Sequence, residues 1–137
     1  MVTAGTCPHP PDKSVLKTSV NADVHVRHRH VASTADEVAT LQAKGYQVWG
    51  VETTERSRGL YETSAELQLA AQRGEPPTKV AVVLGNEIAG CSPHVLGACD
   101  RLVEIPMHGA KNSLNVANCG AIIMYEIVRV LGAREVG

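Results

Sequence analysis

The sequence is poor in aromatic residues, with no phenylalanine, one tryptophan and three tyrosines. A hydrophobic core must therefore be assembled from Val, Leu, Ile and Ala, which is common in α/β proteins. The chain of 137 residues is long enough for one domain with such a core and too short for two ordinary ones. Its hydrophobic share of 44% and charged share of 20% are typical of a globular protein.

Long hydrophobic runs are also absent. No apolar stretch approaches the roughly 20 residues that cross a membrane, and the opening segment MVTAGTCPHPPDKS has no apolar core of a secretory signal. We therefore expect no membrane partner and a cytoplasmic or organellar location. The net charge of −1 gives no overall basic field, so we expect no DNA partner, whereas a local basic patch would still serve an RNA partner.

Metal-ligand patterns are missing as well. The cysteines form no C-x-x-C pair and fit no zinc spacing, so we expect free thiols in a reducing compartment at Cys7, Cys91, Cys99 and Cys119. In the segment HVRHRH, residues 25–30, His28 and His30 lie two apart without an evident third ligand, so we expect no metal site. Phosphate contact and a solvated edge strand are the two interpretations of this segment.

Strand-like and helix-like segments alternate along the chain. The segment KVAVVLG is continuously apolar after its lysine, as expected for a central parallel strand buried on both faces. Thr34 to Glu37 has capping-box spacing, and Ser92 followed by Pro93 is a typical helix start. We expect strands over 22–28, 46–52, 79–85 and from 101 to Pro106, and helices over 34–44, from Ser92 onward and over 113–131, with an ambiguous helical segment within 58–77.

This alternation predicts an α/β fold with a mainly parallel sheet flanked by helices. The proline-rich residues 1–13 are expected to form a loose lead-in. The last helix has apolar or small residues every three or four positions, and these predict its buried stripe: Val116, Gly120, Ile123, Ile127 and Val130.

Polar residues gather where the predicted strands end. ETT (52–54), GNEIAG (85–90) and IPMHG (105–109) follow strands, and SLN (113–115) opens the last helix. Ligands of parallel sheets bind at the carboxyl ends of the strands, where backbone amides can hold polar groups. Taken singly, each segment is more often an ordinary turn or cap than a binding site.

Three segments occur together in a characteristic order. LGNE-x-x-G-x-S, CD-x-x-V-x-IPM-x-G and SLNV resemble the SpoU (TrmH-like) RNA 2′-O-ribose methyltransferases. The similarity continues upstream in LKTS, GYQVWGVETT and LY, and it covers roughly residues 14–133. The resemblance implies that 14–137 form a SpoU-type domain, with a deep trefoil knot over about 80–133.

The resemblance also implies a cofactor and a partner. Members of this family bind S-adenosylmethionine in the knotted loops, largely through main-chain groups, and form homodimers through the knotted region and the last helix. The apolar stripe of that helix is equally compatible with core packing. The positions that match the cofactor site are Val51, Leu84, Gly85, Ile105 and Leu114.

The implied reaction is methyl transfer to a ribose 2′-hydroxyl of tRNA or rRNA. Such a reaction needs in-line positioning and removal of a poorly acidic proton. The candidate catalytic residues are Glu87, Ser113 and Asn115. Asn115 would orient the reacting groups, Ser113 is also a candidate helix cap, and Glu87 would either serve the reaction or hold the loops by accepting N–H bonds.

One family motif is not found. The motif N-x-G-x-I-x-R, which carries an arginine thought to activate the hydroxyl, should precede LKTS, where only about 15 residues stand. Asn21 and Arg27 have its spacing, but Asp23 replaces its glycine. We therefore expect an N-terminally incomplete domain. The alternative function is a catalytically incomplete remnant that binds S-adenosylmethionine or RNA without methyl transfer.

Overall fold

The computed structural model describes residues 1–77, 79–86, 89–110 and 113–132. These residues form two compact units, Met1–Glu37 and Val38–Gly137. Within the described residues, no helix combines the length and the apolar character needed to cross a bilayer.

The N-terminal unit is built on a two-stranded parallel sheet. Its strands are β1 (Val2–Ala4) and β2 (Arg29–Val31), and its helices are α1 (Lys13–Ser19) and α2 (Ala22–His25). Val2–Ala4 thus pair as a strand inside the segment expected to be a loose lead-in. The strand predicted over 22–28 is wrong, because its alternating Val24 and Val26 are both exposed and bury no face.

Helix α3 (Thr34–Ala43) follows the prediction for 34–44 and ends before Gly45, whose φ is +81°. Its first turn differs in one detail. The Asp36 amide donates to the Ser33 hydroxyl at 3.2 Å. The residue that caps the helix is therefore Ser33, one position before the predicted capping box.

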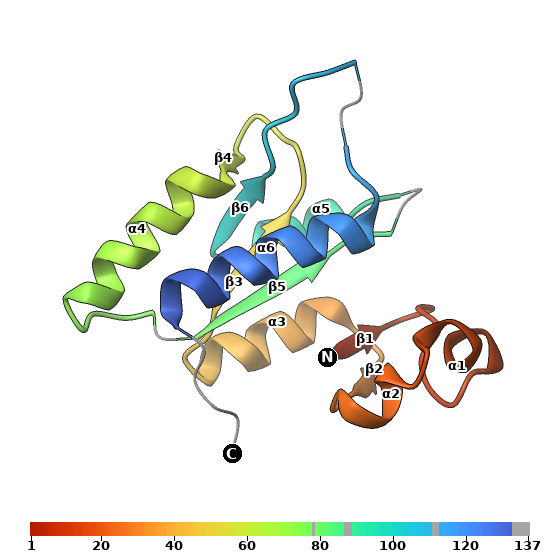
Figure 1. Cartoon of the computed structure of the whole chain (residues 1–137). Coiled ribbons are helices and arrows are strands. Elements are labelled where there is room, and N and C mark those ends of the chain that lie inside the picture. Colours follow the sequence, from red (N-terminus) through yellow and green to blue (C-terminus); the bar gives the residue numbers. More distant parts are fainter. Residues whose placement is uncertain (78, 87–88, 111–112, 133–137) are drawn as a thin grey trace. The chain divides into compact units, whose positions relative to one another are not determined.

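The C-terminal unit contains a four-stranded sheet, which Figure 1 shows with its helices. Its strands are β3 (Gln47–Val51), β4 (Arg58–Gly59), β5 (Val80–Leu84) and β6 (Arg101–Glu104). All pairs are parallel, in the order β4-β6-β3-β5. The predicted α/β class with a parallel sheet flanked by helices is confirmed, while the knot remains a prediction.

The predicted central position of β5 is wrong. Within the described residues β5 pairs only with β3 and forms one edge of the sheet, while β3 and β6 are central. An apolar run indicates that helices cover a strand on its two faces. It does not indicate how many strands pair with it. Burial is deepest on the central strands, where Val48, Trp49 and Val103 are fully inaccessible.

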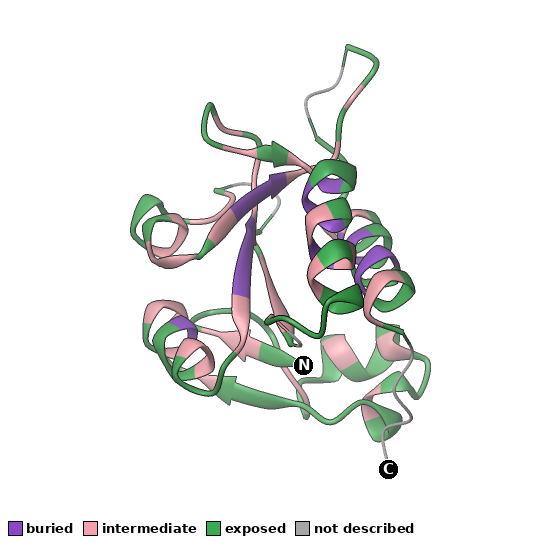
Figure 2. Cartoon of the chain, turned by 90° about the vertical axis from the view of Figure 1, so that its left-hand side faces the viewer, coloured by how far each residue is buried: buried purple, intermediate pink, exposed green. Residues whose placement is uncertain are grey.

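Two helices cover the Trp49 face of the sheet, α4 (Leu60–Gln72) and α6 (Val116–Leu131). They pack against each other, and Figure 2 shows the buried residues gathered between them and the sheet. The ambiguous segment 58–77 therefore resolves into β4 and α4. The core cluster consists of large side chains from these elements: Trp49, Leu60, Leu67, Val103, Ile123 and Ile127.

The opposite face of β3 packs against α5 (Pro93–Ala98), which Ser92 caps as predicted by accepting from the Val95 amide. A Cβ on Gly50 would lie 3.2 Å from Leu96 and 3.0 Å from the Cys99 sulfur, so α5 approaches this strand closely.

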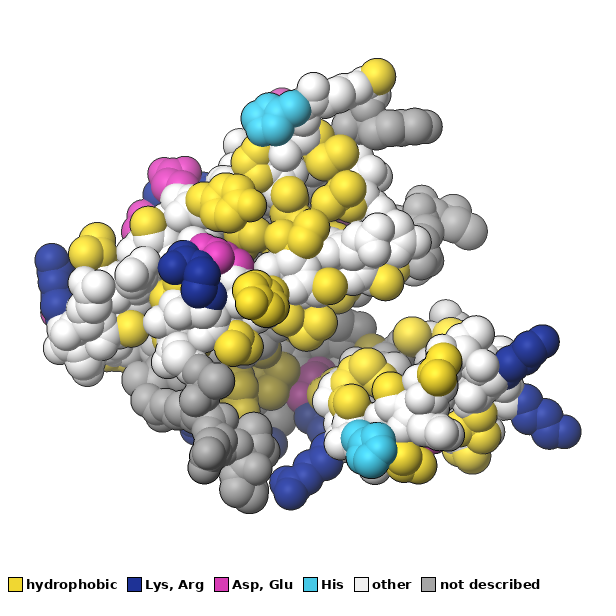
Figure 3. Space-filling model, viewed as in Figure 1, with side chains coloured by type: hydrophobic (Ala, Val, Ile, Leu, Met, Phe, Trp, Pro, Cys, Tyr) yellow, Lys and Arg dark blue, Asp and Glu magenta, His cyan; other side chains and the backbone are white. Residues whose placement is uncertain are grey.

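Helix α6 begins at Val116, three residues later than predicted, with Asn115 rather than Ser113 as its cap. Gly120, Ile123 and Ile127 of the predicted stripe are buried, whereas Val116 and Val130 are half-buried. On its outer side the helix exposes four large apolar residues, Ile122, Met124, Tyr125 and Val128. Figure 3 shows hydrophobic side chains gathered over this helix.

Candidate functional site

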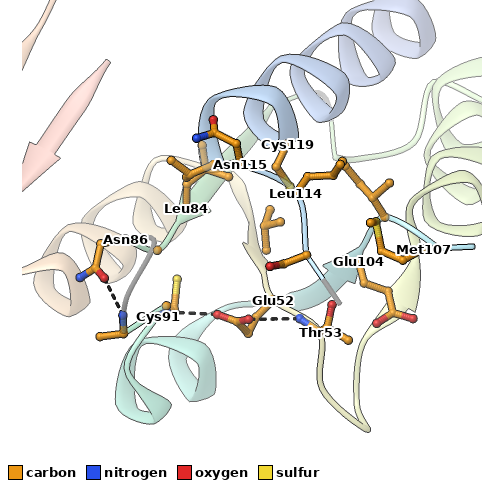
Figure 4. A pocket seen from close by; sticks show the side chains of 17 residues that line it. Glu52, Thr53, Leu84, Asn86, Cys91, Glu104, Met107, Leu114, Asn115 and Cys119 are labelled. Carbon is orange, nitrogen blue, oxygen red and sulfur yellow. Dashed lines mark hydrogen bonds between the residues drawn. The ribbon is translucent and has the colours of Figure 1, made fainter. Parts of the chain in front are cut away.

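A cavity of about 840 Å³ opens where the carboxyl ends of β3, β5 and β6 meet the amino end of α6. Parallel strands place these ends at one edge of the sheet, so residues distant in sequence converge there. Figure 4 shows this cavity with its side chains. Its lining comprises Val51, Glu52, Thr53, Leu84, Gly85, Asn86, Ala89, Gly90, Cys91, Glu104, Ile105, Met107, Ser113, Leu114, Asn115, Val116 and Cys119.

Seven of the eight residues proposed from the sequence line this one cavity. The candidate cofactor residues there are Val51, Leu84, Gly85, Ile105 and Leu114, and the candidate catalytic residues are Ser113 and Asn115. Glu87 lies outside the described residues. The geometry brings the sequence-selected positions together, and their individual roles remain predictions.

A tight turn forms one wall. The Asn86 carbonyl accepts from the Gly90 amide at 3.0 Å, and the Asn86 side chain accepts from the Ala89 amide at 2.6 Å. Gly90 has φ of +63°, a left-handed conformation that glycine adopts without a Cβ penalty. A Cβ on Gly85 would lie 2.5 Å from the Cys91 nitrogen and 2.7 Å from the Gly90 Cα, so the end of β5 fits against this turn only as glycine.

Glu52 ties the end of β3 to the same turn. One carboxylate oxygen accepts from the Cys91 amide at 3.2 Å and the other accepts from the Thr53 amide at 3.3 Å. Gly90 also lies directly against this carboxylate, because a Cβ there would contact Glu52 Oε2 and lie 3.3 Å from its Cδ. The described part of this wall, residues 86 and 89–91, is therefore held by bonds within the turn and by the Glu52 side chain at the end of the neighbouring strand.

The amino end of α6 completes the cavity. The Asn115 Oδ1 accepts from the Ala117 amide at 2.9 Å, so the predicted catalytic amide is also the helix cap. A Cβ on Gly120 would lie 2.8 Å from Leu84 Cδ1, which means that α6 approaches the end of β5 closely. Ser113 and Leu114 precede the helix and are exposed on the cavity side.

The model of the SpoU rRNA Methylase family matches residues 1–125. The chain belongs to this family. A protein of Staphylococcus saprophyticus assigned to the TrmH family of tRNA/rRNA methyltransferases is 32% identical over 117 residues, which cover 85% of this chain and 42% of that protein.

Solved structures agree with this membership. The SpoU methyltransferase AviRb from Streptomyces viridochromogenes, crystallised with the cofactor AdoMet, matches with a TM-score of 0.71 and 26% identity, over 93% of this chain and 48% of that one. An AdoMet-bound rRNA methyltransferase from Sinorhizobium meliloti matches with a TM-score of 0.76 over 96% of this chain and 46% of that one; at 20% identity it supports the fold. The chain spans less than half the length of these relatives.

Two thiols line the cavity of this SpoU family member. Burial raises the pKa of the Cys91 thiol to about 11, with a further contribution from the nearby Glu52 carboxylate. Burial and Glu52 also raise the pKa of Cys119 on α6. Both side chains therefore stay protonated near neutral pH and act as part of the apolar wall rather than as nucleophiles.

Sequence reasoning missed several lining residues, among them Glu52, Glu104, Met107, Cys91 and Cys119. The polar strand end ETT was a usable signal for Glu52. Glu104 directly precedes IPM, at a variable position of the quoted SpoU pattern, and the cysteines carried no pattern that linked them to a site.

The histidines of HVRHRH lie in the N-terminal unit. His30 stacks on His9 with ring centroids 3.9 Å apart, and its Nδ1 lies 3.1 Å from the Thr3 hydroxyl. Among the residues that the structure describes, no group of three or more His, Cys, Asp or Glu side chains is arranged for a metal ion. Phosphate contact by this segment stays a prediction.

Proposed function

We propose that this chain acts in RNA methylation, transferring a methyl group from S-adenosylmethionine to a ribose 2′-hydroxyl of tRNA or rRNA. The observation that carries the proposal is the convergence of the SpoU motif residues on one cavity at the carboxyl ends of β3, β5 and β6. The AdoMet-bound structure of AviRb, a relative at 26% identity, supports the choice of cofactor.

The cavity suits this cofactor in size and chemistry. Its volume of about 840 Å³ lies within the usual range for small-molecule sites, roughly 300–1,000 Å³. Val51, Leu84, Ile105 and Leu114 offer apolar walls for an adenine ring, and the strand ends offer backbone N–H and C=O groups for its edge. When bound, S-adenosylmethionine supplies a methyl group already activated by its positive sulfur.

The contribution of the chain would be positioning and proton removal. Because Asn115 uses Oδ1 for the helix cap, its Nδ2 group is the part that would orient the incoming ribose. Ser113 offers a second hydrogen-bonding group beside it. Glu87 would accept the hydroxyl proton or hold the loop. A Glu87 variant that still binds the cofactor but no longer transfers methyl groups would identify the residue as the proton acceptor.

Two further features belong to this proposal. The segment of about 80–133 would form the trefoil knot of the family. The four exposed apolar residues on the outer side of α6, Ile122, Met124, Tyr125 and Val128, would pack against a second copy of the chain. Association removes such apolar surface from water, which favours dimer formation.

We place the protein in the cytoplasm, with RNA rather than DNA or a membrane as its partner.

The test is transfer of a labelled methyl group from S-adenosylmethionine to RNA, followed by digestion to nucleosides. The proposal predicts label in 2′-O-methylnucleosides and no label with Gly85→Ala. Label confined to the bases would overturn the ribose assignment. Cofactor binding without any transfer would identify a binding remnant in place of an active enzyme.

A further inference from the structure

The cavity at the strand ends has an acidic lining. Two carboxylates face it, Glu52 from the end of β3 and Glu104 from the end of β6. Among its described lining residues there is no lysine, arginine or histidine. A ligand in this cavity therefore lies near two negative side chains, and the described lining offers no cationic side chain.

The two carboxylates differ in their surroundings. Glu52 is fixed, because its two oxygens accept from the Cys91 and Thr53 amides. The Glu104 carboxylate takes part in no hydrogen bond or ion pair within the part of the chain that the structure describes, although the residue is half-buried at the end of a central strand. Its charge is thus uncompensated by a protein partner there. The amino end of α6 contributes an opposing partial charge of about half a unit.

We propose that Glu104, assisted by Glu52, makes this site select the positively charged cofactor over its neutral product. This inference rests on the proposed function. In the transfer, the bond from methyl carbon to sulfur breaks, a bond from methyl carbon to the ribose oxygen forms, and sulfur keeps the electron pair, while the hydroxyl proton passes to water or to the proposed acceptor Glu87. The sulfonium becomes an uncharged thioether, so the product loses the charge that the carboxylates attract.

Simple electrostatics gives the size of the effect. A sphere of the cavity's volume has a radius of about 6 Å, which is shorter than the Debye length of about 8 Å at physiological salt. A unit charge about 6 Å from one carboxylate, at an effective dielectric constant of about 40–80, gains a roughly three- to tenfold preference. The site would release its product more readily than a neutral cavity of the same shape.

Calorimetric titration of the full chain with S-adenosylmethionine and with S-adenosylhomocysteine tests the inference. The wild type should bind the first at least threefold more tightly, and raising the salt concentration should reduce this ratio. Glu104→Gln should lower the ratio about threefold or more, while Glu104→Asp, which keeps the charge, should retain most of it. Glu75→Gln removes one charge from an exposed position outside the cavity lining and should leave the ratio unchanged.

The outcomes separate the two proposals. Equal affinities in the wild type, or a ratio that Glu104→Gln leaves unchanged in a folded protein, would overturn the charge selection while the proposed cofactor stands. Absence of binding for both ligands would overturn the proposed function and this inference together. Thermal melting of each variant shows whether a changed ratio accompanies an intact fold.

Discussion

The carboxylate of Glu52 accepts a hydrogen bond from the backbone amide of Cys91 at 3.2 Å. This bond joins the end of β3 to the turn that follows β5 and so fixes the shape of the cavity wall. The charge of the same side chain faces the cavity. Glu52 therefore both holds the cavity wall in place and contributes to the proposed preference for the charged cofactor.

Gly90→Ala should destabilise the protein by about 1–3 kcal/mol. Gly90 has φ of +63°, where an L side chain is strained, and the new Cβ would displace the Glu52 carboxylate from its bond to Cys91. Urea denaturation measures the change in the free energy of unfolding. Gly97→Ala is the matched control, because its Cβ meets nothing within 4 Å in helix α5 and should be neutral or stabilising by up to about 1 kcal/mol. Equal effects of the two changes would contradict the account of this turn.

Asn115 is predicted to have two separable roles. Asn115→Ala should lower the free energy of unfolding by about 1 kcal/mol through loss of the cap on the Ala117 amide. Asn115→Ser restores a capping oxygen and should recover most of that stability, but it lacks the Nδ2 group and should still transfer methyl groups slowly. Unfolding curves and methyl-transfer rates of both variants make the comparison. Full activity of Asn115→Ser would show that the residue is only a cap.

Glu126 stabilises the contact between α4 and α6. The residue is only 8% exposed, and its carboxylate accepts from the Ser64 hydroxyl at 2.6 Å and is paired with Arg129 at 2.8 Å. Glu126→Gln should lower the free energy of unfolding at neutral pH by about 1–2 kcal/mol, because hydrogen bonds to a charged group are the stronger ones.

The same residue predicts a pH dependence. The hydrogen bonds from Arg129 and then Ser64 lower the pKa of Glu126 in the folded protein to about 2, below the ordinary value of 4.5. A lowered folded pKa stabilises the protein fully above about pH 4.5, and this contribution is lost as the pH falls from there toward 2. The difference between wild type and Glu126→Gln should therefore shrink below pH 4.5 in urea titrations. A difference that stays constant from pH 7 to pH 3 would argue against the pairing.

The outer side of α6 should control association. Tyr125→Glu places a charge among exposed apolar residues and should convert a dimer into a monomer in sedimentation experiments. Tyr61→Glu, on an exposed position of α4, introduces the same charge elsewhere and should leave the dimer intact. A wild-type chain that is monomeric at high concentration would contradict the proposed homodimer.

Much of the C-terminal unit was predictable from the sequence. Apolar runs and helix caps located β3, β5, β6, α3, α5 and α6 within a few residues. The position of β5 at an edge was not predictable, because apolar periodicity does not reveal pairing partners. The strand at 29–31 depends on pairing with Val2–Ala4, a contact distant in sequence that no local pattern encodes.

The site was predictable only where a family motif marks it. Seven motif residues meet in one cavity, whereas Glu104 is missed because its position in the pattern is variable and its role depends on side chains brought together by folding. The cap by Asn115 was also missed, since Ser113 is an equally suitable residue type two positions earlier.

Calorimetric titration of the chain and of two glycine variants with S-adenosylmethionine tests whether the cavity at the strand ends binds this cofactor. We predict binding by the wild type and by Gly97→Ala, whose Cβ meets nothing within 4 Å, and loss of binding with Gly85→Ala, whose Cβ collides with the backbone of the turn. Absence of binding by the wild type at millimolar cofactor, or undiminished binding by a folded Gly85→Ala variant, would contradict this prediction.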